Sequence, residues 1–495
     1  MNYLFGSEAF PAPILDHATI GFIRTVYGIV LTLTLTTALP HARRYFISER
    51  WGGYGQAHWS VALVQNPGVF PLVMGIWFVS ALGLVFGWWV ILAAFVNLIL
   101  CHYFFIQMRW KGALRGMGAP GFVTYWLGTA VFLLEYTRQW APDLSSLALL
   151  VLQVDFALIM LSAGTYKLSS GYRRNEGMEL GLVNPEWGYW LKSWSRLSPN
   201  HWVFWTLNQL AWTTEIIAAL LMLFPSTRFI GGMLILVSFI FIATQIRLGF
   251  LCEMVMVCCL LFFNPGSAGG RLLSSIVPSS AADVVVFPEL PMTIGNQALA
   301  VGLWVYLLLL PFAHAGLAYN FYRRTPLPAI VQRALDLYTN VFGIIIWRVF
   351  SVDITNFFIR IYEQPASGGV RRLISRWGWA GGLRYSQVAE SIAVTNLFTT
   401  LKYYPSDHGM FVERLLRYAR TVPHQSDARL LFEYVSIVKR EGRFDFVPVV
   451  HYFVDVDQHS VVEKTVNDLV SVQAAAHTSP VHEGRSPGTY IPGDH

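Results

Sequence analysis

The feature that most constrains this chain is a series of apolar segments, each about as long as a bilayer core is thick. A membrane-spanning helix needs about 20 mainly apolar residues. We identify nine such segments, at residues 18–38, 68–87, 89–108, 120–137, 146–168, 202–224, 228–247, 249–264 and 296–320. The eighth is short for a full span. The sequence therefore predicts an all-α polytopic membrane helix bundle with about eight to nine transmembrane helices.

The composition agrees with a bilayer as the solvent. Of the 495 residues, 54% are hydrophobic and only 13% are charged, whereas a soluble protein typically carries about 25% charged residues. The formal net charge is +6. In a membrane protein such an excess marks loops that lie near anionic lipid. We therefore expect membrane lipids as partners and no nucleic acid.

Basic residues in the loops predict the orientation. They follow the odd-numbered segments, as Arg43, Arg44, Arg50, Arg109, Lys111, Arg115, Arg173, Arg174, Lys192, Arg196, Arg247, Arg323 and Arg324. The opposite loops hold Arg138, Arg228 and Arg271. Cytoplasmic loops of membrane proteins are enriched in Lys and Arg, and no cleavable signal peptide precedes the first segment. We expect a multi-pass protein of the cell inner membrane, with its N-terminus outside and its C-terminal domain in the cytoplasm.

The chain after the last apolar segment changes character. It is mixed in composition and predicts a small soluble α+β domain, followed by a tail rich in Pro, Gly, Ser and His that we expect to be disordered. The predicted division is a transmembrane bundle at 1–322, an interfacial connector at 323–365, a soluble C-terminal domain at 366–473 and a disordered tail at 474–495.

Several shorter elements are predicted around this division. Residues 169–200 include Trp187, Tyr189, Trp190 and Trp194 among charges, which favours a partly helical segment along the membrane surface. Residues 338–350 are too short to span easily, so we expect another interfacial element. In the C-terminal domain, periodicity predicts helices at 408–421 and 426–440. The β-branched and aromatic residues of 444–456 predict a strand.

Ionisable residues within apolar segments are costly to bury, and each is a candidate for function. They are Arg24, His102, Glu135, Asp155, Lys167, Glu215, Arg247, Glu253 and His314. Lys167 is the most informative, because small residues at 162–165 let another helix approach it closely. A buried amine can act as a base near neutral pH. The alternative is an ordinary lysine whose ammonium group reaches the membrane surface from a helix end.

The run AGTYKLSSGYRRNEGM, at residues 163–178, resembles the motif of the HTTM family. This family contains the vitamin K-dependent gamma-glutamyl carboxylases. Lys167 falls on the family's catalytic lysine, which is thought to be the base that deprotonates vitamin K hydroquinone. The sequence departs from the family at Ser169, where the carboxylases have an acidic residue, and at Tyr172, which stands near their conserved Trp. The large lumenal domain that binds the substrate propeptide is also absent.

Further motifs appear in the family's order over roughly residues 15–360. His102-Tyr103 closes the third segment, where the family often has a histidine. Residues 115–118 (RGMG) resemble its Gly-rich loop, and Glu215 matches a common family glutamate. Residues 347–350 (WRVF) resemble an element that often follows the last membrane helix.

The resemblance implies a carboxylase-like or lyase-like membrane enzyme. A reduced quinone or another lipid would enter between the helices, with Lys167 as the base and His102 and Glu215 in support. The sequence leaves a second function open, a non-enzymatic scaffold that binds lipid or quinone and docks a protein partner through its C-terminal domain. A transporter is a third alternative, but the sequence shows no repeated halves of the kind that many transporters have.

Two other groups of residues carry no predicted chemistry. The histidines and aspartates of the C-terminal domain (His408, His451, His459, Asp407, Asp455 and Asp457) fit no metal-ligand spacing, and we expect no metal. The four cysteines (Cys101, Cys252, Cys258 and Cys259) all lie in apolar segments, so we expect small buried side chains rather than a disulfide framework.

Overall fold

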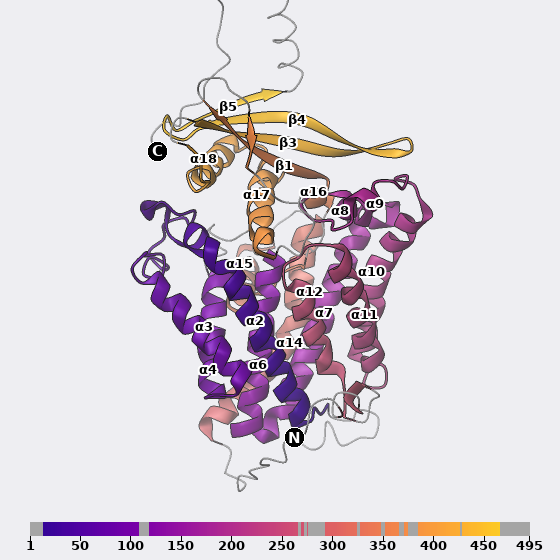
Figure 1. Ribbon diagram of the computed structural model, residues 1–495. Coiled ribbons are helices and arrows are strands. Elements are labelled where there is room, and N and C mark those ends of the chain that lie inside the picture. The colour runs from indigo at the N-terminus through magenta and orange to yellow at the C-terminus, as the bar shows by residue number, and fades with distance from the viewer. Residues whose placement is uncertain are drawn as a thin grey trace, which may run out of the picture.

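The computed structural model describes residues 13–107, 118–265, 269–271, 275, 293–323, 327–347, 352–365, 371–374, 385–425 and 428–465. The predicted tail at 474–495 and most of the two motifs at 115–118 and 347–350 lie outside the described residues. The described part consists of a long helical bundle with an antiparallel sheet across one end (Figure 1). We call this end of the bundle the sheet end.

Within the described residues, each of the nine predicted apolar segments holds a helix. These are α2 (His17–Phe46), α3 (Phe70–Phe86), α4 (Val90–Cys101), α6 (Gly118–Trp140), α7 (Ser145–Ser169), α10 (Trp202–Leu223), α11 (Arg228–Gln245), α12 (Leu251–Cys259) and α14 (Ile294–Arg323). A π-helix, η2 (His102–Gln107), extends α4, and a 3-10 turn, η6 (Leu260–Phe262), extends α12.

Six stretches of the described chain are long and apolar enough to cross a membrane. They are 17–40, 90–107, 142–169, 202–223, 228–245 and 294–323. α3 and α12 are apolar but shorter. A multi-pass membrane bundle is therefore compatible with the helices found, while the number of spans stays a prediction.

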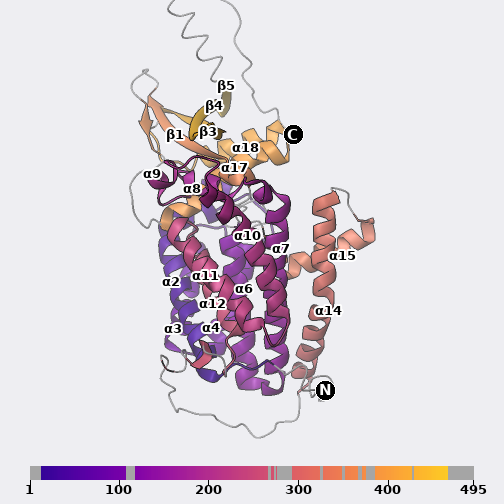
Figure 2. The same ribbon diagram turned by 90° about the vertical axis from the view of Figure 1, so that its right-hand side faces the viewer.

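Small residues bring the helices of the bundle together. Gly164 of α7 packs directly against α10, because a Cβ at Gly164 would lie 3.0 Å from the backbone nitrogen of Ile216. Gly231 of α11 packs in the same way on α10, where a Cβ would lie 2.6 Å from the carbonyl oxygen of Ala218. α14 packs on α7 at the outside of the bundle, with α15 (Ala329–Phe342) beside it (Figure 2).

The sheet has five antiparallel strands in the order β2-β1-β3-β4-β5. They are β1 (Phe357–Pro365), β2 (Arg372–Leu373), β3 (Ala428–Arg440), β4 (Arg443–Asp455) and β5 (Ser460–Thr465). Two helices, α17 (Tyr385–Tyr403) and α18 (His408–Ala419), lie between the sheet and the bundle (Figure 1). β1 lies within residues 323–365, the range predicted as a connector, so the sheet begins earlier in the chain than the predicted domain.

Three of the shorter predictions can be compared directly. The helix at 408–421 is confirmed by α18, whose N-cap Asp407 accepts a hydrogen bond from the backbone N–H of Met410 at 2.9 Å. The strand at 444–456 is confirmed by β4. The helix predicted at 426–440 is wrong, because residues 428–440 form β3 and pair along nearly their whole length with β1 and β4. Whether such a β-branched and aromatic stretch forms a strand or a helix depends on pairing partners that are distant in sequence.

The residues predicted as an interfacial element at 338–350 contain the end of α15, which terminates at Gly343 with a φ of 69°. Residues 344–347 then form no regular element, and Trp347 is buried with its ring stacked on that of Phe239, 6.1 Å between centroids. This part of the chain therefore packs into the bundle at Trp347.

The segment at 169–200 is partly helical, as predicted, with η5 (Tyr172–Arg174), α8 (Met178–Val183) and α9 (Leu191–Trp194). However, every residue of α8 is buried. The Asn184 amide donates to the carbonyls of Thr355 and Phe357 at 2.9 and 2.8 Å. The Glu186 carboxylate accepts from the backbone N–H of Ile359 at 2.9 Å. This segment therefore joins the bundle to the sheet, while its position along a membrane surface stays a prediction.

A second attachment lies at the end of α2. Arg44 donates to both carboxylate oxygens of Glu390 on α17, at 2.8 and 2.7 Å, and to the Thr421 hydroxyl at 2.8 Å. Arg417 of α18 pairs with Glu49 at 3.1 Å. Charged contacts thus fasten the C-terminal domain to the bundle at two separate places.

Candidate functional site

Lys167 and Glu215 form a buried ion pair between two helices of the bundle. Lys167 lies in the last turns of α7 and Glu215 lies within α10, and the Nζ of Lys167 contacts Oε1 of Glu215. Each side chain is only 3% exposed. The close approach at Gly164, one turn before Lys167, places the two helices near enough for this contact. The structure therefore brings together two of the three predicted site residues.

The second carboxylate oxygen of Glu215 is the unusual feature of the pair. Oε2 is buried and has no hydrogen-bond partner among the described residues. Leaving a buried polar atom without a partner costs about 1–3 kcal/mol, and more when the group is charged. Such an atom in a folded protein requires an explanation. A ligand that carries a hydroxyl group would satisfy it.

Tyr172 lies beside this pair, just after the end of α7. The side chain is fully buried. Burial, together with the carboxylates of Glu215 and Glu179, raises the pKa of the Tyr172 hydroxyl well above its ordinary value. Gly177 packs on the ring, since a Cβ there would lie 2.6 Å from a ring carbon of Tyr172. The Tyr172 hydroxyl therefore stays protonated in the electrostatic field of two buried carboxylates.

Glu179 of α8 forms a second buried cluster, which a lysine of the sheet completes. Its carboxylate accepts from the Gly177 backbone N–H at 3.1 Å and from the Asn208 side chain at 2.7 Å. Lys439 of β3 forms an ion pair with it, and also donates to the carbonyl of Asn175 at 2.7 Å. Glu179 is fully buried. The C-terminal sheet thus contributes a charge close to the polar interior of the bundle.

The third predicted site residue, His102, makes its contacts elsewhere. Its Nε2 lies 2.9 Å from the carbonyl oxygen of Val341, and its ring packs edge-on against Tyr125 with 5.5 Å between centroids. Within the described part of the chain, no hydrogen bond or ion pair joins His102 to Lys167 or Glu215.

The other ionisable residues of the apolar segments are held by polar partners. Arg24 pairs with Glu135 at 3.3 Å, and Arg138 pairs with the same carboxylate at 2.5 Å. Asp155 accepts from the indole N–H of Trp126 and the hydroxyl of Tyr306, both at 2.8 Å. Arg247 donates to the carbonyl of Pro185 at 2.9 Å. His314 is an exception, because its buried ring nitrogens have no hydrogen-bond partner among the described residues.

Sequence reasoning missed Glu179 and Lys439. Both lie in polar stretches, where a charged residue is ordinary, and no spacing relates them. Among the described residues, no three His, Cys, Asp or Glu side chains converge as a metal site would require. His451 contacts Glu433 at 3.1 Å instead. The four cysteines are buried and free of disulfides, as predicted.

Comparison with protein-family models, with characterised proteins and with solved structures gave no match. The buried pair between α7 and α10 is therefore the feature of this chain from which a function can be inferred.

Proposed function

We propose that this chain is a multi-pass membrane enzyme that removes a proton from a lipid-soluble, hydroxyl-bearing substrate. The Lys167–Glu215 pair would be the proton acceptor. The observation that carries the proposal is the buried Oε2 of Glu215, which lacks a partner in the described structure while its other oxygen contacts Lys167. The resemblance of residues 163–178 to the HTTM motif supplies the substrate class, a reduced quinone or a related lipid.

The proton balance follows from the pair itself. As an ammonium and a carboxylate, the pair has no net charge. When the substrate hydroxyl transfers its proton to Oε2 of Glu215, the pair gains one positive charge and the substrate oxygen gains one negative charge. The Lys167 ammonium then lies next to the new oxyanion and stabilises it. Fixed charges of this kind act strongly in a water-poor site.

A reduced quinone carries a hydroxyl group that would donate to Oε2 of Glu215, the oxygen that lacks a partner among the described residues. When bound, it would supply an acidic hydroxyl and two electrons for the later chemistry. The residues of this chain would orient that hydroxyl through Glu215 and hold its proton on the pair. His102 has no part in this proposal, because its ring nitrogen is engaged by the carbonyl of Val341.

The test is oxidation of a reduced quinone by the purified protein in lipid nanodiscs, with dissolved molecular oxygen as the acceptor of the two electrons that leave the deprotonated quinone. Glu215→Gln keeps the shape of the side chain but cannot take up the proton. We expect it to lower kcat by about 10²- to 10⁴-fold, the usual contribution of a general base. Lys167→Met should have a comparable effect. Lys192→Met is the matched control, since Lys192 is exposed on α9, and it should leave turnover unchanged.

A further variant separates chemistry from folding. Replacing a buried ion pair by apolar side chains of similar size is often neutral or stabilising, so Lys167→Met combined with Glu215→Leu should fold and be inactive. If this double variant oxidises the quinone as fast as the wild type, the pair is structural and the proposal fails. If the wild type oxidises no reduced quinone, the non-enzymatic scaffold that binds lipid or quinone becomes the better description.

We also propose that the sheet end faces the cytoplasm. The helices α2, α7, α11 and α14 all finish at this end (Figure 1), and the basic loop residues follow them. The positive-inside rule supports this orientation. A reporter fused after residue 495 should give a cytoplasmic signal, and a periplasmic signal would reverse the orientation.

A further inference from the structure

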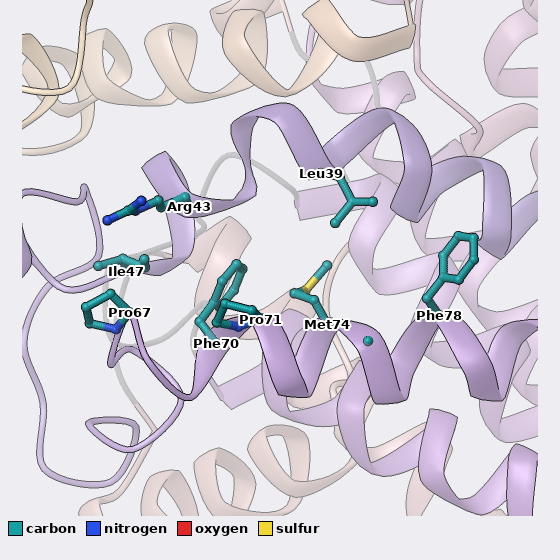
Figure 3. Close-up of a pocket in the computed structure, with 9 residues that line it drawn as sticks. Leu39, Arg43, Ile47, Pro67, Phe70, Pro71, Met74 and Phe78 are labelled. Atoms are coloured by element: carbon teal, nitrogen blue, oxygen red, sulfur yellow. The ribbon is translucent and has the colours of Figure 1, made fainter.

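A groove of about 490 Å³ lies between α2 and α3 near the sheet end of the bundle (Figure 3). Its walls are largely apolar and include Leu39, Phe70, Pro71, Met74 and Phe78. Leu39 and Met74 point toward one another across the gap (Figure 3). The groove lies next to an apolar outer face of α3, where Leu72 is 65% exposed and Val79 is 67% exposed. In a membrane this face would contact acyl chains.

The groove has positive charge at one end. Arg43 is the one charged residue that lines it, and it has no ion pair or side-chain hydrogen bond among the described residues. The next residue, Arg44, is bound to Glu390 of the C-terminal domain, so the two arginines have different surroundings. Phe70 and Pro71, at the start of α3, line the same groove but offer no donor, because the Phe70 N–H donates to the carbonyl of Asn66 at 2.9 Å and proline has no N–H. The arginine is therefore the group that favours an anion.

We propose that this groove binds an anionic membrane phospholipid. One acyl chain lies between α2 and α3, and the phosphate lies at Arg43. The apolar walls and the single cation match the two halves of such a lipid. A free phosphate would use only the charged end. The site is separate from the Lys167–Glu215 pair, which lies between α7 and α10, so each proposal can fail alone.

The experiment measures retention of lipid by the purified full-length protein, using native mass spectrometry with dioleoyl phosphatidylglycerol, dioleoyl phosphatidylcholine and glycerol phosphate as probes. Arg43→Ala should weaken phosphatidylglycerol binding about five-fold, the usual effect of one basic residue at an anionic membrane surface. Gly75→Leu should fill the groove, because the space around a Cβ at Gly75 is open. We expect this variant to lose most of the retained lipid.

Two variants serve as matched controls. Arg50→Ala removes another exposed arginine that follows α2 but does not line the groove. Gly302→Leu adds the same side chain to a glycine of α14 that also faces open space. Both should retain phosphatidylglycerol as the wild type does.

The outcomes divide cleanly. Preference for phosphatidylglycerol over phosphatidylcholine, lost in Arg43→Ala and partly kept in Arg43→Lys, supports the site. Unchanged retention in Gly75→Leu, with a wild-type unfolding temperature, overturns it. Equal retention of the two phospholipids, or binding of glycerol phosphate as tight as that of the lipid, would also overturn it.

Discussion

Lys439 of β3 should be a principal attachment of the C-terminal sheet to the bundle, and Lys439→Met is the change that tests this. The substitution keeps a long unbranched side chain and removes only the ammonium group. It breaks the ion pair with Glu179 and the hydrogen bond to the carbonyl of Asn175. Glu179 is completely buried, so its charge would lose its only ionic partner among the described residues.

The expected loss of stability depends on which contacts the Glu179 carboxylate retains. Removing one partner of a buried ion pair costs about 3–5 kcal/mol. Here the Lys439 side chain is 27% exposed, so part of its charge is already solvated. The carboxylate also keeps hydrogen bonds from Gly177 and Asn208. We therefore expect a loss of about 2–3 kcal/mol in the free energy that holds the sheet in place.

Hydrogen–deuterium exchange in detergent measures this loss locally. Because 1.4 kcal/mol corresponds to a factor of ten, amides of β3 and α8 should exchange about 30- to 150-fold faster, if they open by local separation of the sheet. Arg443→Met is the matched control, since Arg443 forms an exposed pair with Asp445 in the same sheet. An exposed pair contributes at most about 1 kcal/mol.

A second substitution tests the reason for the effect. If the cost comes from a buried charge left without a partner, adding Glu179→Gln to Lys439→Met should recover most of the protection. The reasoning would be refuted if Lys439→Met changed exchange no more than Arg443→Met does. It would also be refuted if the double variant were as unstable as the single one.

Two further predictions concern other parts of the molecule. Burial raises the pKa of Glu433, but the hydrogen bond shared with His451 and the charge of Arg360 lower it more, so that it lies below the ordinary 4.5. The stability that this carboxylate contributes is therefore present above pH 4.5 and is lost as the pH falls through its folded pKa. In thermal unfolding, the Glu433→Gln variant should lack the loss of stability that this carboxylate causes at acid pH. In the bundle, Gly128→Ala should lower the free energy of unfolding by about 1–3 kcal/mol, because its Cβ would lie 2.6 Å from the buried Tyr27 hydroxyl. Thermal unfolding in detergent measures this loss. An unchanged unfolding temperature would show that this contact can relax.

Much of the bundle could be predicted because its signal is local. An apolar run of bilayer length forms a helix wherever it occurs, and the nine predicted runs coincide with helices in the described chain. The sheet was harder to predict, because strand pairing depends on partners distant in sequence. Residues 428–440 contain apolar side chains at spacings that suit a helix, yet Val435 and Ile437 are buried in a strand between β1 and β4.

The candidate site could also be predicted only in part. Lys167 and Glu215 could be singled out because an ionisable residue in an apolar run is conspicuous. That they contact each other depends on the packing of α7 on α10, for which the small residues around Gly164 gave only an indication. His102 was equally conspicuous by this criterion, but the π-helical turn after α4 places it against Val341.

The segment between α7 and α10 links the charge of the sheet to the Lys167–Glu215 pair. Tyr172 feels the charges of both Glu215 and Glu179, and Lys439 of the sheet neutralises the second of these. Detaching the sheet would leave Glu179 as an uncompensated anion near the proposed proton acceptor, and a nearby anion disfavours the loss of a proton from a substrate. Removing the whole C-terminal domain therefore changes attachment and charge together. Lys439→Met and its combination with Glu179→Gln both lack the ion pair of the sheet with α8, but only the single variant leaves an unpaired charge. If this double variant retains quinone oxidation that Lys439→Met alone loses, the sheet acts on the pair through charge.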